Sequence, residues 1–346
     1  MDDELVKKLI VCLAAIALVS CGSPALSSPA PSATATFATS ATPTATAAGA
    51  TSSPAASLSA SLIPLPNAAA VAAAGNGVLW MEVGFDHLFR SLDRGETWVE
   101  RSLPAANTSG SIAFVNDRDG WLLQPVPSIG QCQTQAATLW RTRDGAATWQ
   151  KLDAVGLAPA QCKSSVTFVD ADHGYIPTWD EAGAPKIYRT ADGGQTWTAS
   201  SPLADPPGFV TGPNGKTLRP DTVADFGSIL FADFLAFNDA SRFYVYRSTD
   251  RGATWSFASA APVQGVGVTL VTPTRWIQVI APSASQETTN AGASWHAFAS
   301  DYQQAAPIAP QIVFGDANTG YATVRGGLSR TMDGGAHWTS LKTPGT

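Results

Sequence analysis

An eight-residue motif with the template S/T-x-D-x-G-x-T-W occurs six times in this 346-residue chain. We name it the box motif, and its copies span Ser91–Trp98, Thr142–Trp149, Thr190–Trp197, Ser248–Trp255, Thr288–Trp295 and Thr331–Trp338. Successive copies place their tryptophans about 40 to 60 residues apart, which is the period of repeat architectures. Each copy should therefore mark one supersecondary unit of a repeated fold.

Each fixed position of the box motif has a physical role in a tight turn. The Asp carboxylate can accept hydrogen bonds from the backbone N–H groups that follow it. The Gly suits a positive φ, and the Trp is an apolar plate that can pack between neighbouring units. An apolar run precedes each copy and a short polar run follows it, so we expect a hairpin turn at each. The structural positions assigned to the motif are Asp93, Trp98, Asp144, Trp149, Asp192, Trp197, Asp250, Trp255, Asn290, Trp295, Asp333 and Trp338.

A second phrase, F-x-D/N-x-x-x-G-W/Y, occurs at 114–121, 168–175 and 314–321 and precedes the box motif of its unit. We interpret it as a first strand, a tight turn and a second strand. Roughly 280 residues over six boxes give about 47 per unit, the size of a four-stranded propeller blade. The sequence therefore predicts an all-β propeller over 67–346 with six blades, closed without an exchanged strand. A seventh blade stays open if 200–235 forms a blade that lacks a box.

The box motif resembles the Asp-box, or bacterial neuraminidase repeat, which lies between the third and fourth strands of β-propeller blades in sialidases, xyloglucanases and sortilin-type receptors. Together the two phrases are most similar to the repeat of the photosystem II assembly/stability factor family. This resemblance implies a non-catalytic factor that docks onto a protein partner. The copies depart from the template at Asn290, Ser294 and His337, and at Ala146, which takes the Gly position. We expect the turn at Ala146 to have a different shape.

The first 66 residues lie outside the predicted propeller. Residues 1–20 have a short basic patch and an apolar run, which is typical of an export signal. The run ends in Leu-Val-Ser-Cys-Gly, which resembles a bacterial lipobox and implies a lipid on Cys21; the alternative is a secretory signal with an incidental cysteine. Residues 21–66 are rich in Ser, Ala, Thr and Pro, a composition that favours disorder. We therefore expect an extracytoplasmic protein that is lipid-anchored to the bacterial cell membrane or envelope.

Two cysteines and one long segment are further candidates for structure or function. Cys132 and Cys162 precede predicted strands at the same face of adjacent units, so we expect a disulfide between them, with free buried thiols as the alternative. Residues 200–228 hold several Pro and Gly residues, from which we predict an insertion that is not a regular strand. It is either a functional loop on a rigid scaffold or a tolerated surface excursion.

The sequence assigns no catalytic residue, no metal ligand and no cofactor. Arg90, Arg141, Arg189, Arg247 and Arg330 each precede a box, and this fixed register favours a structural role over one converging sialidase-like site. A xyloglucanase-like hydrolase needs two facing carboxylates, and the predicted inner strands hold few acids outside turns. The Asp-x-Asp turns lack the full calcium-loop pattern. A formal charge of −6 argues against nucleic acid as a partner.

These observations favour a protein-binding or assembly scaffold whose partner is an envelope or membrane protein. The lipid would be its only attachment to the membrane. The alternative is a carbohydrate-binding or glycoside-hydrolysing propeller, and a purely structural surface protein is a third hypothesis. Converging carboxylates or an arginine triad at the channel mouth would favour a glycan. A face with apolar and arginine patches would favour a protein.

Overall fold

The computed structural model describes residues 69–344, except for positions 85, 106–107, 109, 126–135, 160, 181–183, 213–214, 240–241, 263–265, 281–283, 303–310 and 325–326. The predicted export signal, the predicted tether, Cys21 and Cys132 lie outside the described residues. Within these ranges, no helix has the length and apolarity to cross a bilayer.

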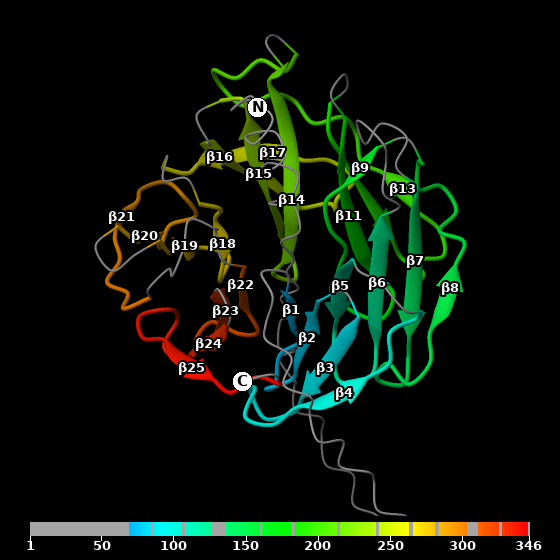
Figure 1. Ribbon diagram of the computed structural model, residues 1–346. Helices are drawn as coiled ribbons and strands as arrows, with labels where there is room; N and C mark the ends of the chain where they lie inside the picture. Colours follow the sequence, from blue (N-terminus) through cyan, green and yellow to red (C-terminus); the bar gives the residue numbers. More distant parts are fainter. Residues whose placement is uncertain are drawn as a thin grey trace, which may run out of the picture.

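Six antiparallel sheets follow one another along the chain and form a propeller ring (Figure 1). Each sheet is one blade, and its strands pair in chain order except at the start of blade 3, where the first two strands both pair with the third. Blade 1 holds β1 (Ala69–Ala73), β2 (Leu79–Val83), β3 (His87–Ser91) and β4 (Val99–Arg101); blade 2 holds β5 (Ser111–Phe114), β6 (Gly120–Pro125), β7 (Ala137–Thr142) and β8 (Gln150–Leu152); blade 3 holds β9 (Cys162–Lys163), β10 (Thr167–Phe168), β11 (Gly174–Trp179), β12 (Lys186–Thr190) and β13 (Thr198–Ala199); blade 4 holds β14 (Thr217–Asp225), β15 (Leu230–Phe237), β16 (Arg242–Ser248) and β17 (Ser256–Ala260); blade 5 holds β18 (Thr269–Leu270), β19 (Trp276–Gln278), β20 (Gln286–Thr288) and β21 (His296–Ala297); blade 6 holds β22 (Ile312–Phe314), β23 (Gly320–Val324), β24 (Gly327–Thr331) and β25 (Thr339–Leu341). The predicted all-β propeller of six blades is confirmed.

Part of the predicted insertion is a strand, so that prediction was wrong for its second half. Strand β14 (Thr217–Asp225) is the first strand of blade 4, and no box-less seventh blade separates it from blade 3. The pairing of β14 with β15 shifts register between Pro220 and Val223. Proline is tolerated there because β14 is an edge strand, and because a residue at a bulge does not need to donate an N–H to the neighbouring strand. The connection between blades 3 and 4 is therefore the shorter segment 200–216.

Each box motif lies between the third and fourth strands of its blade. In the first, the Ser91 hydroxyl donates to Asp93 Oδ1 (2.8 Å) and accepts the Gly95 N–H (2.8 Å). The Thr97 N–H and hydroxyl donate to the two Asp93 oxygens at 2.9 and 2.6 Å. The turn is thus held by one hydroxyl and one carboxylate, which satisfy four polar groups locally.

The box motifs that depart from the template still form this turn. Ala146 takes a φ of 60° and donates its N–H to the Thr142 hydroxyl (2.9 Å), so the expected difference in shape is absent. A left-handed alanine costs about 1–2 kcal/mol, which the surrounding bonds offset. Asn290 donates to the Ser294 hydroxyl (2.9 Å), and His337 Nδ1 lies 2.6 Å from Asp333 Oδ2.

A phenylalanine from the second phrase joins neighbouring blades. The Phe168 ring stacks on Trp121 of blade 2 at 3.6 Å between centroids and meets Trp197 of its own box edge-on at 6.1 Å. A Cβ on Gly174 would lie 2.6 Å from the Phe168 ring. The glycine of the phrase therefore leaves room for the aromatic ring that seals the blade interface. Blades 1 and 2 repeat the stack between Trp80 and Phe114 at 3.7 Å.

Blades 6 and 1 close the ring through side chains. Gln311 Oε1 accepts the Val71 N–H (2.9 Å), and Gln311 Nε2 donates to the Val71 carbonyl (3.2 Å). Trp98 Nε1 donates to the Lys342 carbonyl (3.1 Å). Among the described strands, each blade is built from consecutive strands of the chain and none is exchanged between blades 1 and 6, as predicted.

Candidate docking surface

The ring has two faces with different contents. The turns between strands 1 and 2 and between strands 3 and 4 lie on one face, which we name the box face. The connections between strands 2 and 3, and from each blade to the next, lie on the other, which we name the connection face. Segments of the connection face vary in length and sequence from blade to blade, whereas the box face repeats one turn. A site particular to this chain is therefore expected on the connection face.

The box-face arginines join neighbouring blades. Arg90 Nη1 donates to the Asp117 carbonyl of blade 2 (2.9 Å), and Arg141 Nη2 donates to the Ala171 carbonyl of blade 3 (2.7 Å). Arg330 of blade 6 reaches Glu96 of blade 1 at 2.7 Å. Burial lowers the pKa of Arg141, although the guanidinium stays charged. These guanidinium groups bridge blades and do not converge on one point.

A different arginine marks the connection face between blades 3 and 4. The Arg219 guanidinium carbon lies 3.8 Å from the ring centroid of Trp179 and 3.4 Å from that of Phe237. Arg219 comes from β14, and the two rings come from the ends of β11 and β15. We name these three residues the stacked-arginine cluster. An arginine held between two aromatic faces loses little further entropy on binding, and such groups recur at the centres of protein interfaces.

The connection 200–216 leads directly into β14, which carries Arg219, and buried side chains and hydrogen bonds anchor it to blades 3 and 4. Leu203 and Phe209 are buried at 3% exposure in the interface between blades 3 and 4. The Ala204 carbonyl accepts the Tyr246 hydroxyl (2.6 Å), and the Asp205 carboxylate accepts the Thr211 N–H and hydroxyl. These contacts hold the segment in place while Val210 stays 62% exposed.

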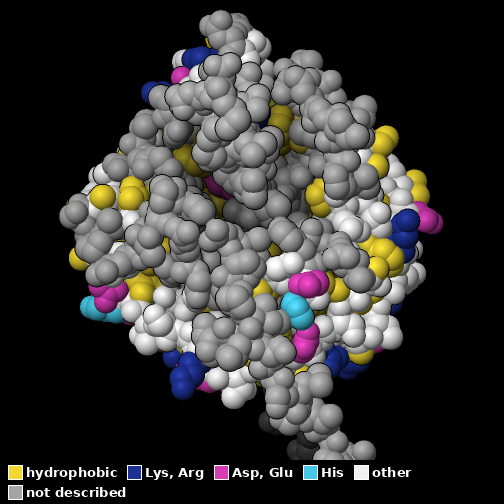
Figure 2. All heavy atoms as spheres, in the orientation of Figure 1, with side chains coloured by type: hydrophobic (Ala, Val, Ile, Leu, Met, Phe, Trp, Pro, Cys, Tyr) yellow, Lys and Arg dark blue, Asp and Glu magenta, His cyan; other side chains and the backbone are white. Residues whose placement is uncertain are grey.

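Positive side chains lie on strands and a connection that neighbour the stacked-arginine cluster: Lys186 pairs with the residue before Trp179, and Arg242 pairs with the residue before Phe237. Lys216 lies 5.8 Å from the Phe209 ring and pairs with Asp239 at 3.1 Å. Arg242 begins β16 and is exposed, and Lys186 begins β12 and is half-buried. Figure 2 shows Lys and Arg side chains at the upper rim of the molecule, where blade 4 lies in Figure 1. This part of the connection face thus combines the exposed Val210 side chain, the rings of Trp179 and Phe237, and several Lys and Arg side chains.

Three acidic side chains in inner strands were missed from the sequence. Glu82 on β2 and Asp233 on β15 are each 3% exposed, and Asp221 lies on β14 beside Asp233. Burial raises the pKa of Glu82 to about 8 and that of Asp233 to about 6. Burial, and then the charge of Asp233, also raise the pKa of Asp221. The sequence could have pointed to Glu82 and Asp233, because each is a single acid within an apolar run, Leu79–Val83 and Leu230–Phe237 respectively.

These acids are parts of the blades. Asp233 accepts the N–H and the hydroxyl of Thr222 across the β14 bulge, and Glu82 accepts the Gly110 N–H from blade 2. At 3% exposure, neither Glu82 nor Asp233 can touch a bound sugar. Within the described ranges, no group of three or more His, Cys, Asp or Glu side chains could hold a metal ion.

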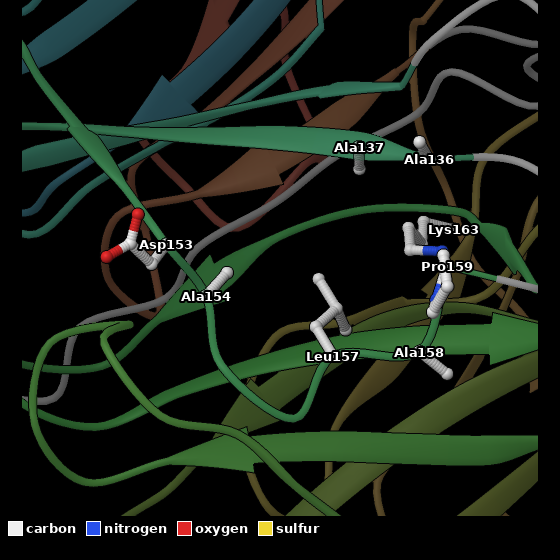
Figure 3. Close-up of a pocket in the computed structure, with 8 residues that line it drawn as sticks. All are labelled: Ala136, Ala137, Asp153, Ala154, Leu157, Ala158, Pro159 and Lys163. Carbon is white, nitrogen blue, oxygen red and sulfur yellow. The ribbon is translucent and has the colours of Figure 1, made fainter.

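A small cavity of about 90 Å³ lies between blades 2 and 3 (Figure 3). Most of its wall is apolar, and Lys163 lies at one end; the apolar lining residues are Ala136, Ala137, Ala154, Leu157, Ala158 and Pro159. A volume of this size holds about three waters and is well below the roughly 300–1,000 Å³ of drug-sized ligand pockets. A sugar ring does not fit into it.

Only one of the two cysteines of the predicted disulfide, Cys162, lies in the described part of the chain. Cys162 on β9 is 4% exposed and is disulfide-bonded. Cys132 lies outside the described residues, so the pairing of the two stays a prediction. The lipidation of Cys21 also stays a prediction.

Comparisons with known proteins give one sequence relative and many similar folds. No family model matches the chain. The photosystem II assembly protein Ycf48 of Synechococcus sp. (strain JA-2-3B'a(2-13)) is 25% identical over 301 residues, which cover 71% of this chain and 79% of that protein. The solved structure of YCF48 bound to a D1 peptide aligns with 78% of this chain and 95% of its own, at 16% identity and a TM-score of 0.43. An oligogalacturonate lyase in complex with manganese aligns over 74% of both chains, at 10% identity and a TM-score of 0.51, a likeness of fold alone.

Proposed function

We propose that this propeller is a non-catalytic scaffold that docks a protein partner on its connection face, over blades 3 and 4. The observation that carries the proposal is the stacked-arginine cluster, together with the exposed Val210 in the connection that leads into β14. Arg and large aromatic residues are the usual centres of protein interfaces. An exposed apolar side chain on an anchored segment, such as Val210, adds buried interface area at little entropic cost. The sequence likeness to an assembly protein supports a docking role.

The proposal includes the placement of the protein in the cell. The predicted signal 1–20, lipidation at Cys21 and the tether 21–66 would hold the propeller outside the cytoplasm near a membrane. An envelope or membrane protein would then be the partner. The six box turns, as Asp-boxes, would serve the scaffold and take no part in recognition. Photosystem II is the assembly named for the relative, and we do not propose it as the partner of this chain.

A glycan is the competing ligand. A glycosidase needs two carboxyl groups that reach the substrate. The described acids with raised pKa values in the inner strands are Glu82, Asp221, Asp225 and Asp233. Glu82 and Asp233 are only 3% exposed. The geometry of the blades therefore favours a protein partner over a sugar substrate.

Site-specific photo-crosslinking tests the proposal. A photoreactive phenylalanine analogue replaces Val210 in the lipid-anchored protein in its own membranes, and mass spectrometry identifies the adducts. Leu92 on the box face is the matched position, since it is 53% exposed. We expect one envelope protein to be captured at position 210 and not at position 92. Capture of the same proteins at both positions would contradict the proposal.

A binding measurement with the captured partner completes the test. Replacing Arg219 by Gln removes the charge between the two rings and should weaken binding at least tenfold, because such central contacts contribute about 2 kcal/mol or more. The control is Arg118→Gln, an exposed arginine on the box face. Retention on a glycan array with no protein adduct at position 210 would shift the assignment to carbohydrate recognition.

A further inference from the structure

A histidine of blade 3 lies between a carboxylate and a guanidinium on the box face. His173 ends the turn between β10 and β11, and its Nδ1 lies 2.9 Å from Asp170 Oδ2. Its Nε2 lies 3.2 Å from Nη1 of Arg251, which belongs to the box motif of blade 4. Beside this contact, a Cβ on Gly252 would lie 3.0 Å from the Tyr175 ring, so the box of blade 4 packs on the start of β11. The contact between His173 and Arg251 therefore joins two blades.

The donors and acceptors fix the protonation state that this geometry requires. A guanidinium only donates hydrogen bonds, so His173 Nε2 has to accept and carries no proton. Nδ1 then carries the ring proton and donates it to Asp170. A protonated ring would instead place two cationic donors 3.2 Å apart with no acceptor between them, and like charges at this distance repel. The contact thus needs a neutral imidazole.

We propose that the contact between His173 and Arg251 is a pH-sensitive link between blades 3 and 4, closed while the imidazole is neutral and open when it takes up a proton. Histidine is the side chain that changes its charge between pH 5 and 8. The bond to Arg251 is therefore present at the upper end of this range and is lost towards the lower end.

The bond between His173 and Asp170 persists in both states. Burial raises the pKa of Asp170, but hydrogen bonds from His173 and Asp172 outweigh burial and leave that pKa below its usual value. The carboxylate therefore stays ionised over this range and accepts the Nδ1 proton whether or not Nε2 is protonated. Asp170 holds the ring in place, and the change on protonation is confined to the side that faces Arg251.

The backbone at Arg251 supports a role for its side chain. Arg251 has a φ of 55° at the fourth position of its box motif, where three other boxes have glycine with φ values of 69°, 73° and 75°. A Cβ makes this left-handed conformation less favourable, so an arginine is a costly choice there. The hydrogen bond that its guanidinium donates across the blade interface offsets part of this cost.

The charged groups around the contact come from blades 2, 3 and 4. Asp225, at the end of β14, interacts electrostatically with both His173 and Arg251, which makes it an anionic partner for the released guanidinium. Arg141 of blade 2 donates to the Ala171 carbonyl at 2.7 Å. The other charged or titratable groups nearby are Asp170, Asp172, Tyr175 and Arg189. Protonation of His173 should therefore turn Arg251 from the imidazole towards Asp225.

NMR of the full chain labelled with ¹⁵N-histidine tests the required protonation state. At pH 8 we expect the His173 ring to carry its proton on Nδ1 and none on Nε2. The variant His173→Gln assigns the signal among the four histidines of the chain. A proton on Nε2 at pH 8 would overturn the proposal, because Nε2 could then not accept from Arg251.

Hydrogen exchange of the box 248–255 measures the opening. After correction for the intrinsic pH dependence of exchange, we expect the protection of this box to fall at least about twofold from pH 8 to pH 5, since an exposed hydrogen bond to a charged group contributes modestly. Arg251→Gly, which suits the left-handed backbone, should give the lower protection at both pH values. Arg94→Gly, at the same position of the box of blade 1 with a φ of 62°, is the matched control and should keep the wild-type response.

The variant His173→Gln identifies the group that titrates. Its side chain takes up no proton in this range, so the pH response of 248–255 should disappear. A response that persists in folded His173→Gln protein would come from another group, such as Asp225, and would refute the assignment. Equal protection of the wild-type box at pH 8 and pH 5 would refute it as well.

Discussion

Replacement of Glu82 by Gln should remove a large part of the pH dependence of stability. Glu82 lies on β2, accepts the Gly110 N–H, and has its Oε1 buried without a partner among the described residues. Burial raises its pKa from 4.5 to about 8. The folded state therefore binds more protons than the unfolded state between these two pH values, and the free energy of unfolding falls as the pH rises through this window.

The magnitude follows from the pKa displacement. Each pKa unit corresponds to about 1.4 kcal/mol, so ionising Glu82 in the folded state costs on the order of 5 kcal/mol by pH 8. That is a large share of the roughly 5–15 kcal/mol by which a domain is stable. A Gln amide keeps an acceptor for Gly110 and has no charge to bury. We expect Glu82→Gln to be near neutral at pH 5 and stabilising by several kcal/mol at pH 9.

Urea denaturation from pH 5 to pH 9 measures the effect. The quantity of interest is the difference between wild type and variant, because Asp221 and Asp233 titrate in both proteins and cancel. Asp153→Asn, at an exposed position directly after β8, is the control and should give a flat difference across the series. Parallel stability curves for wild type and Glu82→Gln over this range would refute the argument that Glu82 is neutral in the folded blade.

Three further predictions concern the packing, the ring closure and the turns. Gly174→Ala should cost about 1–3 kcal/mol in urea denaturation, because the added Cβ would overlap an aromatic ring that joins two blades, whereas Gly327→Ala, whose Cβ meets nothing within 4 Å, should be neutral. Gln311→Ala should cost about 2–4 kcal/mol by the same measurement, since both backbone groups of Val71 lose their partner; an unchanged midpoint would count against the closure. Hydrogen bonds, above all from the Thr254 side chain, lower the pKa of Asp250 to about 2. The ionised carboxylate therefore stabilises the fold above pH 3.8, and this stabilisation is lost as the pH falls towards 2. Asp250→Asn should therefore lose about 1 kcal/mol or less at pH 6 after solvent screening, and acid melts of the two proteins should converge near pH 2.

The box motif and the phenylalanine phrase predict the fold well because each is short and local. A turn held by its own hydroxyl and carboxylate forms wherever those residues occur at that spacing. Because each blade contains one such turn, the number of copies gives the number of blades. Pro220 misled the prediction for 200–228, since a proline excludes a central strand and not an edge strand with a bulge. Periodicity could not reveal that β14 is an edge.

The stacked-arginine cluster could not be predicted from the sequence. Trp179, Arg219 and Phe237 come from three strands of two blades, and only the ring geometry brings their ends together. Nothing in the local pattern distinguishes Arg219 from the arginines that precede the boxes. Glu82 and Asp233 were visible as acids in apolar runs, but their partners lie elsewhere, Gly110 just before β5 and Thr222 on β14.

The closure of the ring also sets an order of events during synthesis. The hydrogen bonds between Val71 and Gln311 join residues 240 positions apart, and blade 1 cannot cover its apolar face until blade 6 exists. At about 5–20 residues per second, the ribosome needs roughly 12–48 s to make that stretch. For this time Val71, Leu79 and Met81, which end up fully buried against blade 6, lack their final neighbour. The nascent chain is then most exposed to aggregation and to capture by blade 6 of a second molecule.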